Sequence, residues 1–487
     1  IKGLVFRTKP DSALPAQWNE EAYLQKNPGA AKAVGESFLT GYEHYCNCGR
    51  ADGLDPDWND QDPQEDPGSG STEIVGKFPL PSWMDRETRL FGEFEPAFMP
   101  SISGKAVLEG KWSSPIVDVY RRCWRMIAPV QPTHVILMHS LRTGGAELSA
   151  LHTMEAILSS PSSRVLVITA ENGDDLWQDR LPDGATWLPF SAMAASCDYE
   201  QQIEVLTRLL INCGARCLHI SYSWYGWDLL TRHAAALANR MHLFLSIFSV
   251  ALPNLGVGAG YARDLPPLIP YLAGVLTDNE HTAQQLCSVS GIDTSRVTVL
   301  RHPVTVKQRF SGPSQDCNTV LWASRIDREK RPDLLIQIAE LLPSVEFHVY
   351  GRSVFGDDQL LEQVKAVGNI KYCGPYSGFE TIPQVPYAMY LYTSHWDGLP
   401  NAVLEAMQSG LLVVASDVGG ISEVVQDDTG ILIRDYDNVE AYVSMVRDVL
   451  NNPDSYRGRA ETGRKQIAGS FTKQAFLESL QRAPDYL

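Results

Sequence analysis

The chain has 487 residues, of which 44% are hydrophobic and 20% are charged, and its formal net charge is −17. Such a chain can bury sizeable cores and should divide into two or three domains, while its acidic balance argues against a nucleic-acid partner and against wholesale docking on anionic lipid. Nine cysteines, an odd number, fit a reducing cytoplasm better than a disulfide framework. No apolar run reaches membrane-spanning length, so we expect a cytoplasmic protein whose membrane contact is at most peripheral, at the inner face.

The first 130 residues carry no regular α/β pattern. Residues 1–53 have apolar side chains at near-helical spacing and are predicted to form a small helical accessory module. Residues 54–72 contain six acids, no Lys or Arg, and several Pro and Gly, which indicates a solvated acidic linker. Residues 73–130 carry aromatic side chains without a clear period, so an irregular segment packed on the next domain is expected. The chain begins at Ile1 and not at Met, which leaves open that it is a fragment of a longer protein.

From residue 131 onward, short apolar strands alternate with helical segments, as in a parallel sheet wound with helices. One series of strands is predicted at 134–139, 164–169, 216–221, 242–248, 274–277 and 296–300. A second series is predicted at 319–324, 345–351, 370–373, 389–394, 411–416 and 430–433. The pattern predicts two Rossmann-like domains, residues 131–305 and 306–470, and a last helix within 471–487. Because open α/β folds bind ligands at the carboxyl ends of their strands, a binding cleft is expected between the domains.

The most informative stretch is 394–425, which sets two carboxylates, Asp397 and Glu405, eight positions apart around a predicted helix start. Asp397 lies in the turn just before the helix, so its carboxylate and the first free backbone N–H groups can face one ligand. A carboxylate binds hydroxyls and a helix N-terminus binds phosphate, a combination that suits a sugar nucleotide. The other residues of the turn and helix start that are expected to bind it are Gly398, Leu399, Asn401, Ala402, Val403 and Leu404.

This stretch resembles the acid-x7-acid signature of the GT-B retaining glycosyltransferases of family 4, the glycosyl transferases group 1, of the type found in bacterial polysaccharide biosynthesis. Asp397 stands where the family normally has Glu, so acidity is kept on a shorter arm. The resemblance implies two Rossmann-like domains facing across a cleft, the first binding the acceptor and the second the donor. It also implies that the helix in 471–487 crosses back to the first domain. The segment from about residue 22 to residue 53 looks like a short repeat often found beside such enzymes.

A pair of cations follows the first predicted strand of the second domain. Arg325 and Lys330 are five residues apart in a loop, where they can hold a diphosphate from two sides. The loop is similar to the family's Gly-Arg-Leu-x-x-x-Lys-Gly segment, which implies that both cations bind the donor diphosphate and stabilise it as it leaves. With Asp397 they are the predicted catalytic residues.

Further binding residues follow from the resemblance. Gly144 and Gly145 lie between a strand and a helix, where paired glycines let a ligand approach the backbone, and the family has the same loop beside the donor phosphate. Tyr376 falls at the family's base-contacting turn, and Glu405 takes the position that accepts the ribose hydroxyls. Many family members have a His after the fourth strand of the first domain that is missing here. His219 remains a candidate for contact with the sugar or the acceptor, and a satisfied core histidine is the alternative.

The predicted activity is transfer of a sugar from a nucleoside-diphosphate sugar to a hydroxyl of a glycan or lipid-linked oligosaccharide acceptor, with retention at the anomeric carbon. The family implies no metal and no other cofactor. A metal at His44, Cys46 and Cys48 is disfavoured, because no second Cys/His pair follows at zinc-ligand spacing. The alternatives are a non-catalytic module that binds a nucleotide sugar or a glycan, and an epimerase or phosphorylase on the same fold. The sequence leaves open the base, the sugar, the acceptor and the oligomeric state.

Overall fold

The computed structural model describes residues 115–487 except for a few short stretches, namely 143, 172–174, 251–263 and 354–357. The predicted accessory module, the acidic linker and the disfavoured metal trio lie outside the described residues. Within the described part, no helix is long and apolar enough to cross a membrane.

Helix α6 (Pro115–Ile127) shows that the prediction of irregular structure for 73–130 is wrong over its last part. Its buried residues Val119, Cys123 and Ile127 recur every four positions, as on one face of a helix. That face packs on the first domain, against the helices α8 (Phe190–Met193) and α9 (Tyr199–Asn212) and the strand β3 (Ala185–Pro189).

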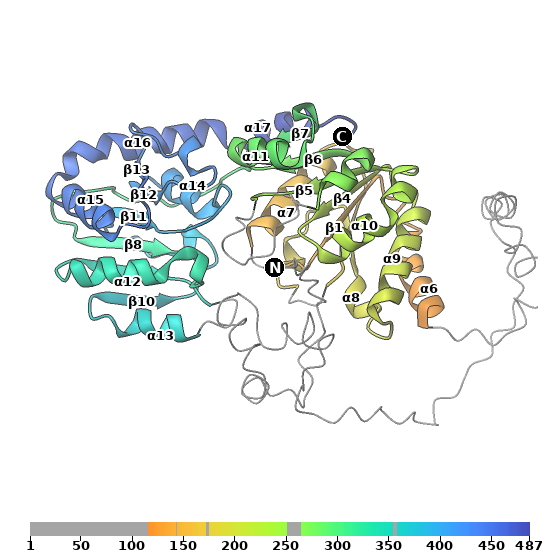
Figure 1. The fold of residues 1–487 in the computed structure, drawn as a ribbon, viewed down its shortest axis with the longest axis horizontal. Coiled ribbons are helices and arrows are strands. Elements are labelled where there is room, and N and C mark those ends of the chain that lie inside the picture. Colours follow the sequence, from red (N-terminus) through yellow and green to blue (C-terminus); the bar gives the residue numbers. More distant parts are fainter. Residues whose placement is uncertain (1–114, 143, 172–174, 251–263, 354–357) are drawn as a thin grey trace, which may run out of the picture.

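The first domain is built on a seven-stranded parallel sheet with the order β3-β2-β1-β4-β5-β6-β7 (Figure 1). Its strands are β1 (His134–Met138), β2 (Val165–Thr169), β3 (Ala185–Pro189), β4 (Cys217–Ser221), β5 (His242–Ser246), β6 (Leu272–Thr277) and β7 (Val297–Val299). Its helices after α6 are α7 (Gly145–Leu158), α8 (Phe190–Met193), α9 (Tyr199–Asn212), α10 (Trp224–Ala238) and α11 (Glu280–Ser290).

Strand β3 was not predicted from the sequence. It is an edge strand, and four of its five residues are only partly buried. Such a strand lacks the continuous apolar run that identifies a strand buried on both faces.

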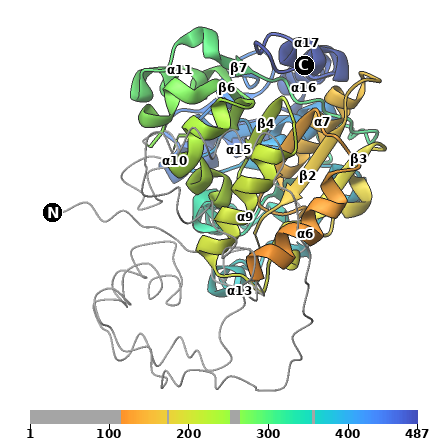
Figure 2. The ribbon, with the colours of Figure 1, turned by 90° about the vertical axis from the view of Figure 1, so that its right-hand side faces the viewer.

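Alternate residues of β1 divide the core of the first domain between the two faces of the sheet. Val135 and Leu137 pack in one cluster with side chains of α6, α9 and α10, whereas Ile136 and Met138 pack in another with side chains of α7. Figure 2 shows α6, α9 and α10 together in front of the strands and α7 behind them. The sheet is therefore covered on both faces, as its continuous apolar strands predict.

The second domain is a six-stranded parallel sheet with the order β10-β9-β8-β11-β12-β13. Its strands are β8 (Thr319–Ala323), β9 (Glu346–Tyr350), β10 (Ile370–Gly374), β11 (Met389–Tyr392), β12 (Val413–Ser416) and β13 (Ile431–Ile433). Its helices are α12 (Pro332–Leu341), α13 (Asp358–Ala366), α14 (Asn401–Gln408), α15 (Val439–Asn451) and α16 (Pro453–Ser470). Buried side chains of α12, α13 and α15 share one core cluster, and those of α14 share the cluster on the other face.

The end of the chain lies against the first domain. Helix α16 packs on α14 in the second domain, and the next helix, α17 (Lys473–Leu480), packs on α7 and β7 of the first (Figure 1). Phe476, Leu480 and Tyr486 complete the core cluster beside α7. The Nζ atom of Lys473 also lies 2.6 Å from Oε2 of Glu155 in α7. This segment thus ties the two domains together.

Candidate functional site

Lys330 and Asp397 form an ion pair where β8 and β11 end, with the Asp397 side chain 22% exposed. Lys330 ends a 3₁₀ turn after β8, and its side chain is 9% exposed. Its Nζ lies 2.5 Å from Oδ2 of Asp397, and the hydroxyl of Tyr392, the last residue of β11, donates to the same oxygen. The other oxygen of Asp397 accepts from the N–H of Gly398 at 2.9 Å. Two predicted catalytic residues that are 67 positions apart thus meet in one place.

Both members of the pair have a partner for their charge. Burial pushes the pKa of Asp397 upward, but the Lys330 ammonium, the Tyr392 hydroxyl and the Gly398 N–H hold it below its ordinary value. Burial lowers the pKa of Lys330, and the Asp397 carboxylate opposes that shift. The arrangement is an ion pair with hydrogen bonds to its carboxylate, in surroundings of low dielectric constant where charge interactions are strong.

Arg325 lies beside this pair. It follows β8, its side chain is 37% exposed, and its guanidinium pairs with Asp327 at 2.9 Å and with Glu329. After burial and Asp397, Arg325 is the next contributor to the pKa of Lys330, which it lowers as a neighbouring cation does. The Nζ of Lys330 also lies 3.4 Å from the Glu329 oxygen that pairs with Arg325, so the two predicted cations meet at one carboxylate.

The start of α14 offers fewer free donors than the sequence suggests. The N–H groups of Val403 and Leu404 donate to the carbonyl of Pro400 at 3.0 and 3.4 Å, and both side chains are buried in the core. The prediction that these two N–H groups bind the donor is therefore wrong as the structure stands. Asn401 and Ala402, the first two helical residues, hold the N–H groups that an α-helix leaves unpaired at this end.

Leu399 and Gly398 are engaged by the first domain instead of being open to a ligand. The side chain of Leu399 is buried, and its N–H faces the carboxyl of Asp278, whose pKa it lowers. A Cβ atom at Gly398 would lie 2.2 Å from the carbonyl oxygen of Phe248. Leu399 thus lies at the contact between the domains, and direct donor contact through it stays a prediction.

The Gly144–Gly145 loop leads into α7 and faces the loop of Arg325 and the start of α14. A Cβ atom at Gly144 would lie 2.1 Å from Oε2 of Glu147, whose carboxylate folds back over the loop. Burial raises the pKa of Glu147, and both Arg142 and, more weakly, Arg325 of the second domain lower it. A Cβ atom at Gly145 would lie 3.4 Å from the side-chain amide of Asn401. The loop after β1 therefore meets the cation loop and the start of α14.

Tyr376 and Glu405 are neighbours beyond the carboxyl end of β8. The Tyr376 hydroxyl is 3.3 Å from the carbonyl oxygen of Ala323, the last residue of β8, and the Glu405 charge raises the pKa of Tyr376 further after burial has raised it. Burial raises the pKa of Glu405 to about 7, although its carboxylate accepts the N–H of Phe379 at 3.3 Å. A carboxyl group with this pKa changes charge near neutral pH.

His219 does not reach the site. It lies in the middle of β4, is 1% exposed, and uses both ring nitrogens within the protein, each at 2.7 Å, toward the hydroxyls of Tyr486 and Ser246. Burial lowers its pKa to about 3, so it is neutral. The prediction of a sugar or acceptor contact is wrong, because the C-terminal segment covers this histidine.

Three residues of the site were missed in the sequence: Tyr392, Glu147 and Asp278. Tyr392 and Asp278 lie at or just after the carboxyl end of a strand, and Glu147 lies in the first turn of the helix that follows β1. That position was the available signal, since ligands of such folds bind at this edge. Among the described residues, no group of three His, Cys, Asp or Glu side chains is placed to hold a metal ion.

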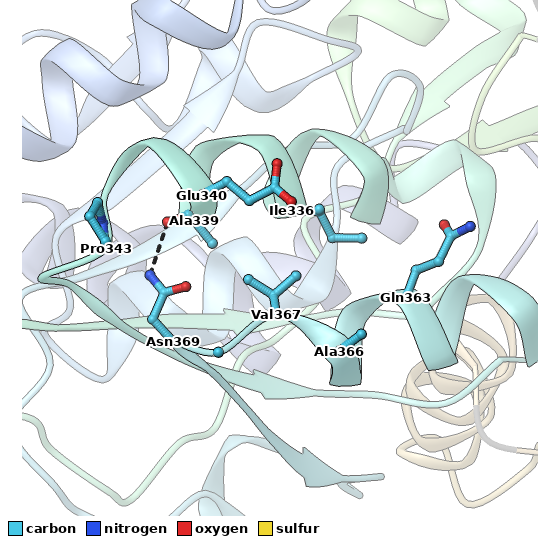
Figure 3. Close-up of a pocket in the computed structure, with 9 residues that line it drawn as sticks. Ile336, Ala339, Glu340, Pro343, Gln363, Ala366, Val367 and Asn369 are labelled. Atoms are coloured by element: carbon cyan, nitrogen blue, oxygen red, sulfur yellow. Dashed lines mark hydrogen bonds between the residues drawn. The ribbon is translucent and has the colours of Figure 1, made fainter.

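A hollow of about 710 Å³ lies elsewhere, between α12 and α13 (Figure 3). It is lined by Glu340 and Pro343 at the end of α12 and by Val367 and Asn369 before β10. Asn369 lies across it and donates to the carbonyls of Ala339 at 2.9 Å, of Leu342 at 3.0 Å and of Val345 at 2.9 Å. The hollow lies at the amino ends of β9 and β10, opposite the edge where the charged residues gather.

Residues 305–466 match the family model described as Glycosyl transferases group 1. The second domain belongs to the glycosyl transferases group 1. The matched span contains Arg325, Lys330, Asp397 and Glu405, so the group 1 domain carries the motifs on which the resemblance was based.

Curated relatives share about a quarter of the aligned residues. Spore coat protein SA of Bacillus subtilis is 27% identical over 176 residues, which cover 33% of this chain and 47% of that protein. D-inositol 3-phosphate glycosyltransferase of Mycolicibacterium smegmatis is 25% identical over 286 residues, or 53% of this chain and 64% of that protein. The chain thus spans between about half and two thirds of the length of these relatives.

Solved structures share the fold at low identity. Anabaena HepE, in complex with UDP and glucose, has a TM-score of 0.59 at 17% identity and covers 73% of this chain and 100% of its own. The lipopolysaccharide outer core galactosyltransferase WaaB, in apo form, has a TM-score of 0.54 at 16% identity and covers 72% and 98%. With its two parallel sheets, this chain has the GT-B architecture.

Proposed function

We propose that this protein is a retaining glycosyltransferase that moves a sugar from a nucleoside-diphosphate sugar to a hydroxyl of a glycan or lipid-linked glycan in bacterial polysaccharide biosynthesis. The observation that carries the proposal is the buried Lys330–Asp397 pair, which lies beside Arg325 and just before α14. It combines two cations suited to a diphosphate with a carboxylate suited to sugar hydroxyls. HepE, which shares the fold, was solved with UDP and glucose.

In the proposed reaction the bond from the anomeric carbon to the diphosphate oxygen breaks, while the acceptor oxygen bonds to the same face of that carbon. The acceptor proton passes to the leaving diphosphate. Arg325 and Lys330 stabilise the charge that develops on the diphosphate, and Asp397 orients the sugar through its hydroxyls. Catalysis is then mainly preorganised electrostatics and alignment, with no metal ion or other cofactor.

The ion pairs of the site fit this role. Arg325 is held by Asp327 and Glu329, and Lys330 by Asp397, so the cations are already in place before a substrate arrives. A preorganised charge needs little reorganisation during the reaction, which is the main source of its catalytic effect. On this proposal Tyr376 and Glu405 bind the nucleoside, and Gly144, Gly145 and the first N–H groups of α14 border the phosphates.

The test is transfer by the purified chain from UDP-, GDP- and dTDP-sugars to glycan acceptors, followed by mass spectrometry and by NMR of the anomeric configuration of the product. Arg325→Ala, Lys330→Ala and Asp397→Ala should each lose about 10²–10³ in kcat. EDTA should leave the rate unchanged. Near-normal turnover in any two of the three variants breaks the assignment.

The same assays separate the alternatives. Conversion of the donor without an acceptor would indicate an epimerase, and a requirement for phosphate would indicate a phosphorylase. Binding of a nucleoside diphosphate with no turnover on any acceptor would indicate a non-catalytic binding module.

A further inference from the structure

Two glycine turns of the group 1 domain pack against the first domain, one on backbone and one on a side chain. Gly398 lies against Phe248, which follows β5, and a Cβ atom at Gly420 would lie 2.4 Å from the Cβ of Asn279, the N-cap of α11. The N–H of Gly420 donates to the carbonyl of Gly398 at 2.9 Å, so the two turns are also tied to each other. Side chains would not fit here, and the position of both turns therefore depends on the other domain.

More hydrogen bonds cross the same contact. The indole N–H of Trp396 donates to the carbonyl of Val250 at 3.1 Å, and the N–H of His281 in α11 donates to Glu423 at 3.0 Å. The residue just before Asp397 and the residues after β12 are thus fixed from the first domain. The turn that carries Asp397 is part of an interdomain contact as well as of the site.

Asp278 lies at the centre of this contact. It follows β6, and its carboxyl group accepts from the side-chain amide of Asn279 at 2.5 Å, while the N–H of Leu399 faces it and lowers its pKa. Its Oδ1 would lie 3.3 Å from a Cβ at Gly398. A carboxyl group of one domain therefore holds the turn, two residues long, that follows Asp397 in the other.

We propose that Asp278 is a positioning residue that sets the place of the Asp397–Leu399 turn when the two domains are in contact. The inference rests on the proposed function, because the purpose of that placement is to align Asp397 with the sugar. A misplacement of about 1 Å in an active site can cost on the order of 10² in rate, so a single hydrogen bond to this turn is worth testing.

The surroundings of Asp278 favour its neutral form. Burial is the main cause that raises the pKa of Asp278 to about 8, and the Asp397 charge raises this pKa further. The Asn279 amide and the Leu399 N–H act in the opposite direction and lower it. The charged groups packed nearest are Asp397 with its partner Lys330, and Glu423, which accepts N–H groups at the start of α11, with the exposed Glu280 beside it.

The raised pKa of Asp278 makes the stability of the interdomain contact depend on pH. When the domains are apart, water solvates Asp278 and its pKa returns toward the ordinary 3.8. The Asp278 carboxylate therefore takes up a proton when the two domains come into contact. The contact is most favourable below the ordinary pKa, weakens as the pH rises, and reaches its weakest level above about 8.

The first experiment does not need activity. Hydrogen exchange of the full chain is measured by mass spectrometry for peptides covering 396–402, with peptides from β8 as the reference. Asp278→Ala should raise exchange at the 396–402 peptide at least several-fold, and Asp278→Asn, which keeps an acceptor for the Leu399 N–H, should raise it less. Glu280→Gln removes a neighbouring exposed acid and should change nothing.

The pH series then isolates the carboxyl group. Relative to the reference peptides, wild-type protection of 396–402 should fall between pH 6 and pH 8, and Asp278→Asn should show no such fall. In turnover assays, Asp278→Ala should lower kcat about 10-fold or more while the UDP dissociation constant, measured by calorimetry, changes little.

Unchanged exchange and unchanged kcat in Asp278→Ala refute the proposal, as does a pH response that persists in Asp278→Asn. If the exchange results hold but no donor and acceptor pair supports transfer, the contact stands and it is the glycosyltransferase proposal that fails. If Asp278→Ala does not fold, Asp278→Asn and its pH series decide the question.

Discussion

Replacing Lys330 by Met removes the ammonium and keeps most of the aliphatic chain, which leaves the Asp397 carboxylate, whose side chain is only 22% exposed, without its ion-pair partner. Breaking a buried pair in this way costs about 3–5 kcal/mol of folding free energy, because the remaining charge is uncompensated. The hydroxyl of Tyr392 and the N–H of Gly398 still donate to Asp397, so we expect a loss at the lower end of that range.

The double variant Lys330→Met/Asp397→Asn separates stability from catalysis. With the second charge gone, it should recover most of the lost stability, yet it should remain about 10²–10³-fold slower than wild type or worse. Stability is measured by urea unfolding and turnover by release of the nucleoside diphosphate. Lys365→Met is the control, since Lys365 pairs at 2.7 Å with Glu362 on an exposed helix face and should cost at most about 1 kcal/mol.

The pH dependence gives a further check on the same variants. In wild type the pKa of Asp397 is below its ordinary value, so the pair stabilises the fold above pH 3.8 and that stabilisation is lost as the pH falls through the lowered pKa. In Lys330→Met the carboxyl group should take up a proton more readily, and the stability deficit should shrink toward acid pH. Equal deficits at pH 5 and pH 8, or a double variant no more stable than Lys330→Met, would refute the reasoning.

Three further outcomes are expected. Gly144→Ala should lower kcat/KM at least 10-fold, because the new methyl group meets the carboxylate folded over the loop, whereas Gly458→Ala, with open space around it, should leave kcat/KM unchanged. The affinity for UDP, measured by calorimetry, should rise with pH through about 7 as Glu405 becomes a carboxylate, and Glu405→Gln should flatten that profile. His219→Ala should lower the free energy of unfolding by about 1–3 kcal/mol, seen as a lower midpoint of thermal unfolding, and should leave KM unchanged. A change in KM without a loss of stability would indicate that His219 contacts the substrate after all.

The apolar strand pattern was sufficient to predict two parallel sheets, because strands buried on both faces must be apolar along their whole length. The edge strand β3 and the helix α6 escaped this reasoning, since both keep one exposed face and their apolar residues are interrupted. Residues 394–425 and the cation loop carried enough local information to nominate Arg325, Lys330 and Asp397.

The sequence by itself determined the two-sheet plan and the kinds of residue in the site, because burial and helix-start chemistry are encoded by residues near one another in the chain. Only the tertiary structure decided that Lys330 pairs with Asp397, that Gly398 lies against Asp278, and that His219 is covered by the C-terminal segment. Each of these contacts joins residues at least 67 positions apart. No local pattern specifies such distances, because they depend on how the two domains and the last helix pack together.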